Sequence, residues 1–312
     1  MTALLEAKGL KVYYSSPRGD IRAVEDVNLE VGEHEIVGLA GESGSGKSTL
    51  ALGMMRLITT PGRVTGGEVN FEGRNILTIP NEEFRKDYRW SKMAMVFQGS
   101  MNGFTPVFTV GDQIDEVMKI HGREGGKTAV RKLLEMVDLD ESIGRRYPHE
   151  LSGGQKQRAF IAMALALEPK MLFADEPTTA LDVITQVNIV NLLKRLRREM
   201  GISILLITHD LALLSELVDT AYIMYSGRIV EQGPSKIMFT NPKHPYTQGL
   251  LAATPTLRST TIQGIPGFMP DLANPLNMCS FSPRCPYVMD RCKTERPELK
   301  RTDGEDVACW LY

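Results

Sequence analysis

The sequence predicts an α/β protein with a mostly parallel sheet and helices on both faces of that sheet. Short apolar runs that suit buried strands alternate with longer segments of helical spacing, and polar residues gather where the runs end. Sheets of this kind bind ligands at that edge, so the chemistry is expected there. The expected strands are residues 34–41, 170–177 and 202–210, and the expected helices are residues 47–58, 153–169 and 182–201.

The other segments indicate the domain organisation. The segment from about 84 to 160 is rich in helix signals and lacks long apolar strands, which indicates a helical subdomain inserted in the core. Residues 221–233 predict a hairpin with Ser226 and Gly227 in its turn. Proline and glycine become frequent after about residue 242. We therefore expect a main domain of residues 1–242 and a loop-rich extension of residues 243–312.

Composition excludes several classes of function. The 36 basic residues nearly balance the 38 acidic ones, so no nucleic-acid partner is expected. No run of about 18 apolar residues occurs, and the start of the chain lacks the features of a signal peptide. The expected location is the cytosol, where the protein could still dock on a membrane protein.

Residues 41–50, GESGSGKSTL, predict a phosphate-binding loop between a strand and a helix. Gly41, Gly46, Lys47 and Ser48 match the pattern G-x-x-x-x-G-K-[ST]. Glycines let backbone N–H groups curl around an anion, and the helix that follows points its positive end at it. Lys47 would reach the terminal phosphates, and the Ser48 hydroxyl would bind Mg²⁺. A flexible Gly/Ser loop is the alternative, which the flanking strand and helix disfavour. The other predicted nucleotide contacts of this loop are Ser43, Gly44, Ser45 and Thr49.

Acidic residues at the end of the strand over 170–177 predict the second half of the site. Asp175 could hold Mg²⁺ through its water shell, and Glu176 could deprotonate the attacking water. An acid that merely caps the next helix is the alternative. His209 ends the strand over 202–210 and could contact a γ-phosphate. A lone histidine is more often structural, so His209 depends on its neighbours.

Six motifs occur in the order GESGSGKST, VFQ (96–98), LSGGQ (151–155), FADEP (173–177), ALD (180–182) and THD (208–210). ATP-binding cassette (ABC) ATPases have motifs of this kind in this order, and the sequence resembles that family over roughly its first 240 residues. The resemblance implies a P-loop cassette with an antiparallel β subdomain and an inserted helical subdomain. It also implies ATP and Mg²⁺ as cofactors, and two cassettes that enclose two ATP molecules head to tail.

The resemblance also implies roles for individual residues. Glu176 matches the catalytic base and His209 the switch histidine. Gln98 would complete the Mg²⁺ shell, with Ser48 and Asp175, and would sense the transmembrane partner.

Further contacts to the nucleotide follow from the same resemblance. Asp182 lies in the loop that communicates across the dimer, and Tyr14, rather than Tyr13, would stack on adenine. Without the resemblance, LSGGQ predicts only a capped helix start. The signature residues implied to grip the partner's ATP are Ser152, Gly153, Gly154 and Gln155.

The C-terminal part is similar to one branch of the family, the oligopeptide and dipeptide importer ATPases. The similarity is carried by residues 241–257 and 265–292, and by YPHELSGGQKQR and DEPTTALDV. It implies hydrolysis of ATP at the cytoplasmic face of the membrane, as a peripheral subunit that powers peptide uptake. The implied partners are two transmembrane permease subunits, an external solute-binding protein and a second related ATPase, with a homodimer as the alternative to a heterodimer. Alternatives are oligosaccharide or nickel uptake, a soluble ABC ATPase that remodels other molecules, and a scaffold that binds ATP without turnover.

Four cysteines gather near the end of the chain with the spacing C-x₅-C-x₆-C-x₁₆-C. Disulfides, zinc, free thiols and an iron–sulfur cluster all remain open from the residues, since the spacing fits neither the usual zinc nor the common ferredoxin patterns. The resemblance to the importer group implies a [4Fe–4S] cluster. The implied ligands are Cys279, Cys285, Cys292 and Cys309.

Overall fold

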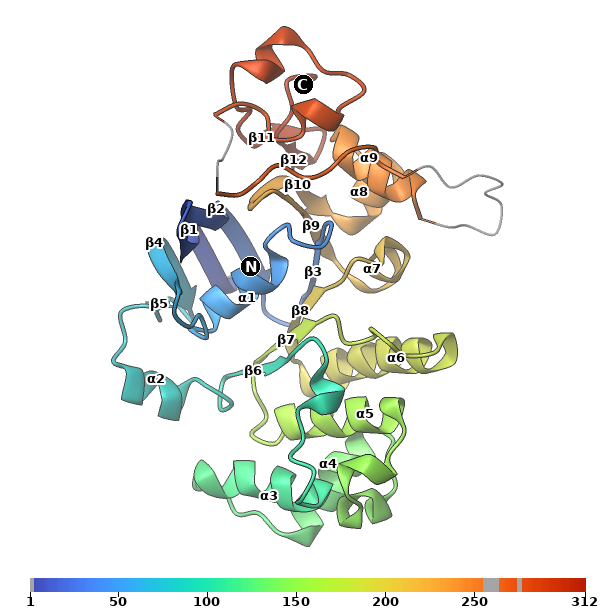
Figure 1. Cartoon of the computed structure of the whole chain (residues 1–312). Helices are drawn as coiled ribbons and strands as arrows, with labels where there is room; N and C mark the ends of the chain where they lie inside the picture. The colour runs from blue at the N-terminus through green and yellow to red at the C-terminus, as the bar shows by residue number, and fades with distance from the viewer. Residues whose placement is uncertain (1–2, 255–263, 274–276) are drawn as a thin grey trace. The chain divides into compact units, whose positions relative to one another are not determined.

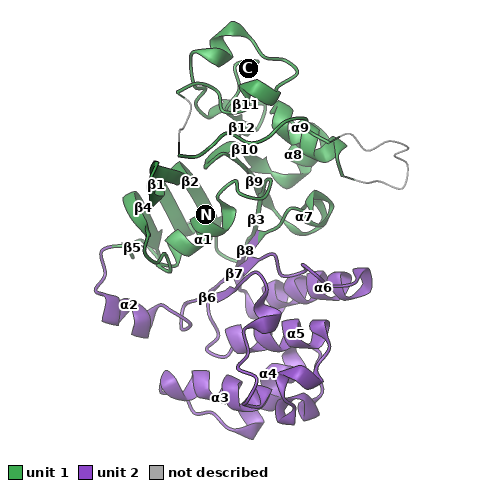
Figure 2. Cartoon of the chain, viewed as in Figure 1, with its two compact units in different colours: residues 1–77, 207–312 green, residues 78–206 purple. Residues whose placement is uncertain are grey.

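The computed structural model describes residues 3–254, 264–273 and 277–312. It divides the chain into two compact units (Figure 2). Unit 1 contains residues 1–77 and 207–312, and unit 2 contains residues 78–206. The phosphate loop therefore lies in unit 1, together with the described part of the C-terminal extension. Residues 255–263 and 274–276 of that extension lie outside the described residues.

Unit 1 begins with an antiparallel sheet in the order β2-β1-β4-β5 (Figure 1). β1 pairs with β2 on one side and with β4 on the other, and Val12 and Val24 meet across the first pair with both side chains fully buried. This sheet is the antiparallel subdomain that the family resemblance implied. Its strands are β1 (Ala3–Ser16), β2 (Gly19–Gly32), β4 (Gly62–Phe71) and β5 (Arg74–Asn75).

The second set of strands in unit 1 has the order β11-β12-β10-β9-β3. β3 is parallel to β9, and β10 returns antiparallel through a turn in which Ser226 and Gly227 both have positive φ, which confirms the predicted hairpin. β12 pairs with β10, so the extension adds two strands to this sheet. The strands are β3 (Ile36–Ala40), β9 (Thr220–Tyr225), β10 (Arg228–Pro234), β11 (Lys300–Thr302) and β12 (Glu305–Val307). The helices are α1 (Lys47–Met54), α7 (Leu211–Leu217), α8 (Ser235–Thr240) and α9 (Pro245–Ala252).

Unit 2 combines parallel strands with a group of helices. β6 (Met93–Val96) runs parallel to β7 (Met171–Asp175), and β8 (Ser203–Ile207) follows β7 in the sheet order. All residues of these strands are buried, as expected for strands covered on both faces. The predicted α/β class with parallel strands is therefore confirmed. The helices are α2 (Asn81–Asp87), α3 (Val110–Ile120), α4 (Lys127–Met136), α5 (Gly153–Ala164) and α6 (Val183–Met200).

Two predicted helices were too long. The helix predicted over 47–58 ends at Met54, because Arg56 adopts φ 53° and turns the chain toward β4. The helix predicted over 153–169 ends at Ala164, where the Leu165 N–H bonds both Ile161 and Ala162 and so tightens the last turn. Helix-forming residues continue beyond both ends, but the chain must turn back into the sheet there. Among the helices of the described residues, none has both the length and the apolar character needed to cross a bilayer.

Candidate active site

Two glycines of the phosphate loop are fixed by backbone that passes close to them. A Cβ atom on Gly41 would lie 2.2 Å from the Met224 carbonyl oxygen, and one on Gly46 would lie 2.1 Å from the Ala23 carbonyl oxygen. Both glycines also have positive φ, of 152° and 107°, which side chains disfavour. The loop is thus pressed against β2 and β9, and no other residue type fits at either position.

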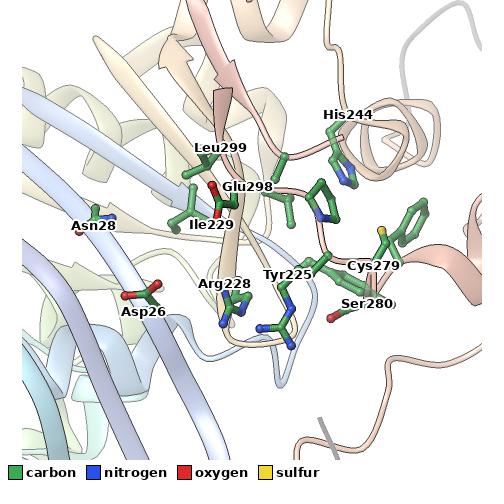
Figure 3. A pocket seen from close by; sticks show the side chains of 15 residues that line it. Asp26, Asn28, Tyr225, Arg228, Ile229, His244, Cys279, Ser280, Glu298 and Leu299 are labelled. Atoms are coloured by element: carbon green, nitrogen blue, oxygen red, sulfur yellow. The ribbon is translucent and has the colours of Figure 1, made fainter. Parts of the chain in front are cut away.

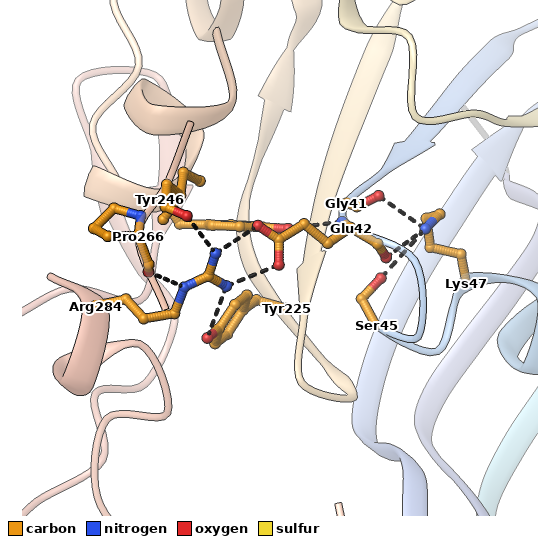
Figure 4. Close-up of polar contacts among 9 residues, drawn as sticks. Gly41, Glu42, Ser45, Lys47, Tyr225, Tyr246, Pro266 and Arg284 are labelled. Atoms are coloured by element: carbon orange, nitrogen blue, oxygen red, sulfur yellow. Dashed lines mark hydrogen bonds and ion pairs between the residues drawn. The ribbon is translucent and has the colours of Figure 1, made fainter. Parts of the chain in front are cut away.

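Lys47 lies inside this loop with only 6% of its surface exposed. Its Nζ donates to the Gly41 and Glu42 carbonyl oxygens at 2.8 Å each and to the Ser45 hydroxyl at 3.4 Å (Figure 4). α1 starts at Lys47 without a side-chain cap on its first N–H groups. A buried cation and uncapped helical N–H groups in one loop are suited to bind phosphate oxygens.

His209 follows the strand next to the loop. The Thr208 N–H donates to the Leu39 carbonyl oxygen at 3.2 Å, so this segment pairs with β3 shortly before Gly41. His209 is exposed, and Asp210 caps α7 by accepting from the Leu213 N–H at 3.1 Å. This cap fixes the backbone of Asp210, the residue that directly follows His209.

The acidic residues lie in unit 2 at the end of β7. Asp175 is 3% exposed. The register aligns Val96 of β6 with Ala174 of β7, which places Gln98 and Glu176 at equivalent positions just beyond the strands. The Gln98 amide donates to Glu176 Oε2 at 3.1 Å. Glu176 has φ 47°, a strained conformation that is frequent at functional sites.

The signature segment LSGGQ opens α5. Ser152 caps the helix, and its side chain and that of Gln155 form a reciprocal pair of hydrogen bonds with each other's backbone N–H at 3.3 and 3.0 Å. Ser152 and Gly153 are exposed. A Cβ on Gly154 would lie 2.5 Å from the Thr185 methyl carbon, so a glycine is required where α5 meets α6.

Asp182 is tied to the same threonine. It caps α6 by accepting from the Thr185 N–H at 3.0 Å and hydroxyl at 2.6 Å, and these hydrogen bonds hold the pKa of Asp182 below its ordinary value. Thr185 therefore joins the signature helix to the loop that carries Asp182.

The two candidate tyrosines of β1 have different surroundings. Tyr13 donates to Glu25 Oε2 at 2.5 Å, and burial with this bond raises the pKa of Tyr13 to about 12. Tyr14 is half-buried, and its ring lies over Gly62, where a Cβ would be 2.6 Å from the ring. Tyr13 thus has a structural partner, and the role of Tyr14 toward adenine stays a prediction.

Comparison with known proteins identifies the family. The family model "ABC transporter" matches residues 24–179, and a second, "Oligopeptide/dipeptide transporter, C-terminal region", matches residues 230–292. The chain belongs to the ATP-binding proteins of ABC transporters. A probable peptide ABC transporter ATP-binding protein of Sinorhizobium fredii is 42% identical over 98% of this chain and 94% of its own length. An oligopeptide transport ATP-binding protein of Escherichia coli K12 is 42% identical over 99% of this chain and 93% of its own length.

The three-dimensional structure is also similar to that of a solved ABC cassette. An ATP-binding cassette, solved as a dimer in a post-hydrolysis state with ADP and phosphate, matches with a TM-score of 0.67 and 30% identity. The match covers 74% of this chain and 99% of that one. The chain therefore has the fold of an ABC cassette and, as a member of this ATPase family, is an ATP-hydrolysing enzyme.

The sequence analysis did not predict several side-chain hydrogen bonds that fix the candidate site residues. Thr179 donates to Glu176 Oε2 at 2.8 Å, and Thr185 joins α5 to Asp182. Ser100, two residues after Gln98, donates to Gln157 of α5 at 2.8 Å in the interior. The position of Thr179, three residues after Glu176, and that of Thr185, three after Asp182, are typical of local capping bonds and could have indicated these contacts.

The four cysteines are reduced and gather in unit 1. Together they line one small cavity, with Tyr287 and Trp310 and without any carboxylate. Burial raises the pKa of Cys309 to about 11 and those of Cys279 and Cys285 above their ordinary value, which favours the thiol over the thiolate form of these three residues. Within residues 3–254, 264–273 and 277–312, no group of three or more His, Cys, Asp and Glu side chains is arranged to hold a metal ion.

A larger cavity of about 490 Å³ lies beside this cysteine group (Figure 3). Its walls include Cys279, Tyr225, Arg228 and His244, and complete burial lowers the pKa of His244 to about 3. None of the residues predicted to bind the nucleotide lines it. The cavity is therefore separate from the predicted nucleotide contacts.

Proposed function

We propose that the chain is the ATP-hydrolysing subunit of a peptide importer and lies at the cytoplasmic face of the membrane as a peripheral protein. The observation that carries this proposal is the match of residues 230–292 to the C-terminal region of oligopeptide and dipeptide transporters, in addition to the cassette. The full-length relatives named for peptide transport support it. The proposed partners are two permease subunits, an external solute-binding protein and a second related ATPase. We also propose the division into a cassette of residues 1–242 and an extension of residues 243–312.

The proposed roles of the residues follow their surroundings. Lys47 binds the terminal phosphates, and Glu176, oriented by Gln98 and Thr179, activates the attacking water. His209 contacts the γ-phosphate. The proposed Mg²⁺ ligands are Ser48, Gln98 and Asp175, the ATP contacts offered to a partner cassette are Ser152, Gly153, Gly154 and Gln155, and Tyr14 stacks on adenine.

Peptide uptake by cells tests the proposed cargo. Cells that lack the gene are expected to lose uptake of labelled dipeptides and oligopeptides, and the wild-type gene is expected to restore it. A gene that carries Glu176→Gln should fail to restore uptake although the protein is made, because transport needs hydrolysis. Unchanged peptide uptake, together with lost uptake of an oligosaccharide or of nickel, would contradict a peptide cargo.

We further propose that Cys279, Cys285, Cys292 and Cys309 hold a [4Fe–4S] cluster. Four free thiols around one cavity, without competing carboxylates, are a donor set that iron–sulfur clusters use. Among the described residues no three such side chains are arranged for a metal, so binding would require the thiols to close around the cavity. The cluster would cross-link the extension in a structural or redox-sensing role, since ATP hydrolysis requires no electron transfer. The thiols must lose their protons to bind it, so loading is expected to release protons.

Anaerobic purification tests the cluster. The protein is expected to be brown, with an absorption band at about 400 nm and about four iron and four sulfide per chain, as the cluster's formula requires. Cys292→Ser should lower the iron content, whereas Ser280→Ala, next to Cys279, should leave it unchanged. A colourless protein with one zinc per chain, or with no metal, would overturn this proposal.

A further inference from the structure

The C-terminal extension makes a direct ion pair with the phosphate loop (Figure 4). The Arg284 side chain is 4% exposed. Its Nη1 donates to Glu42 Oε2 at 2.8 Å, and its Nη2 donates to Glu42 Oε1 at 2.9 Å. Glu42 is the second residue of the loop that starts at Gly41. A two-pronged pair of this kind fixes orientation as well as position, because both carboxylate oxygens are held by a rigid planar group.

The remaining donors of Arg284 fasten it to its surroundings. Nε donates to the Pro266 carbonyl oxygen at 2.9 Å, Nη2 to the Ile265 carbonyl oxygen at 3.3 Å, and Nη1 to the Tyr225 hydroxyl at 3.4 Å. All five donors of the guanidinium are therefore used. Such an arginine cannot follow Glu42 if the loop moves, so it acts as a fixed anchor rather than a flexible surface charge.

Glu42 is held from three directions. Its backbone N–H donates to the hydroxyl of Tyr246, a fully buried residue of α9, at 2.7 Å. Its carbonyl oxygen accepts from Lys47 Nζ at 2.8 Å. Arg284 and Tyr246 of the extension thus supply two of the three contacts that fix Glu42. Lys47, the proposed phosphate ligand, supplies the third.

The charge of Glu42 makes the pair relevant to ATP binding. A carboxylate in a loop that must receive a triphosphate repels the ligand unless a cation compensates it. A preorganised loop also binds more tightly than one that must first be ordered. Arg284 meets both needs, and removing it would leave a negative charge on a loosened loop.

We propose that Arg284 is a positioning residue of the ATPase, which compensates the charge of Glu42 and keeps the phosphate loop ordered for ATP. It acts through Glu42 and does not contact the nucleotide. Because Arg284 immediately precedes Cys285, the cysteine-bearing segment is linked to the phosphate loop by one side chain. This inference concerns ATP binding by the cassette and is independent of the transported cargo.

The experiment measures equilibrium ATP affinity and steady-state hydrolysis of the full chain. Arg284→Met keeps the apolar stem but removes the charge and the donors. It is expected to raise both the Kd and the KM for ATP about tenfold, with kcat within about threefold, since coupling between sites is typically of this size. Arg284→Lys should lie between wild type and Arg284→Met, because it keeps the charge without the planar fork.

Two further variants separate positioning from a structural role. Adding Glu42→Gln to Arg284→Met should return the Kd to within about threefold of wild type, since the uncompensated carboxylate is gone. Arg301→Met removes an exposed arginine of the same extension, paired with Asp306 at 3.4 Å, and should leave the Kd unchanged. The proposal is overturned if folded Arg284→Met binds ATP like wild type, or if its loss persists in the double variant.

Discussion

Replacing Glu176 by glutamine is expected to lower the rate of ATP hydrolysis about a thousandfold while leaving ATP binding intact, since a general base contributes about 10²–10⁴ in rate. Glutamine has nearly the same shape as glutamate, so the strained backbone at φ 47° and the contacts with Gln98 and Thr179 can persist in part. The amide cannot accept a proton from water at neutral pH. Hydrolysis fails while the phosphate loop, in unit 1, keeps its structure.

Phosphate release and equilibrium ATP binding measure the two effects separately. Because cleavage no longer reopens the closed state, the variant should also form a stable dimer with ATP, visible by size-exclusion chromatography. Glu135→Gln is a matched control, since the Glu135 side chain lies on α4 in an exposed ion pair with Arg131. Turnover at the wild-type rate by Glu176→Gln would remove Glu176 from its proposed role.

The local geometry of the candidate site was predictable because each motif depends on residues close in sequence. The loop that contains Gly41, Gly46 and Lys47 is a strand–turn–helix unit, and its glycines are required by backbone a Cβ would strike. The pairing of Gln98 with Glu176 follows once their strands are known to be parallel neighbours, because both residues then lie just beyond the strand ends.

Contacts between distant segments could not be predicted in this way. Arg284 is 242 positions from Glu42, and nothing in either local pattern indicates the other. β12 has three residues and gains its place by pairing with β10 and β11, so its composition gave no strand signal. The helix ends after Met54 and Ala164 were missed for a related reason, since the need to return to the sheet outweighs local helix propensity.

Replacing Lys47 by alanine is expected to raise the Kd for ATP at least about a hundredfold and to abolish measurable hydrolysis, because charge-assisted bonds to the phosphates are lost. The lysine Nζ now has three acceptors inside the loop, at 2.8, 2.8 and 3.4 Å. Phosphate oxygens would compete for the same ammonium group. Alanine removes this cation and leaves the Gly41 and Glu42 carbonyl oxygens facing the incoming negative charge.

Thermal unfolding with and without ATP separates lost binding from lost folding. A ligand that binds only the folded state stabilises it by an amount that grows with its concentration over Kd, so wild type should melt at a higher temperature when ATP is added. Lys47→Ala should show no such rise at the same ATP concentration, whereas Lys132→Ala, at an exposed position of α4, should keep it in full.

The stability of Lys47→Ala without ATP depends on two opposing effects. The substitution removes a buried cation, whose desolvation disfavours folding, and it also removes the hydrogen bonds that compensate for that cost. Its melting temperature without ATP is therefore expected to stay near that of wild type, and a rise with ATP equal to that of wild type would exclude Lys47 from phosphate binding.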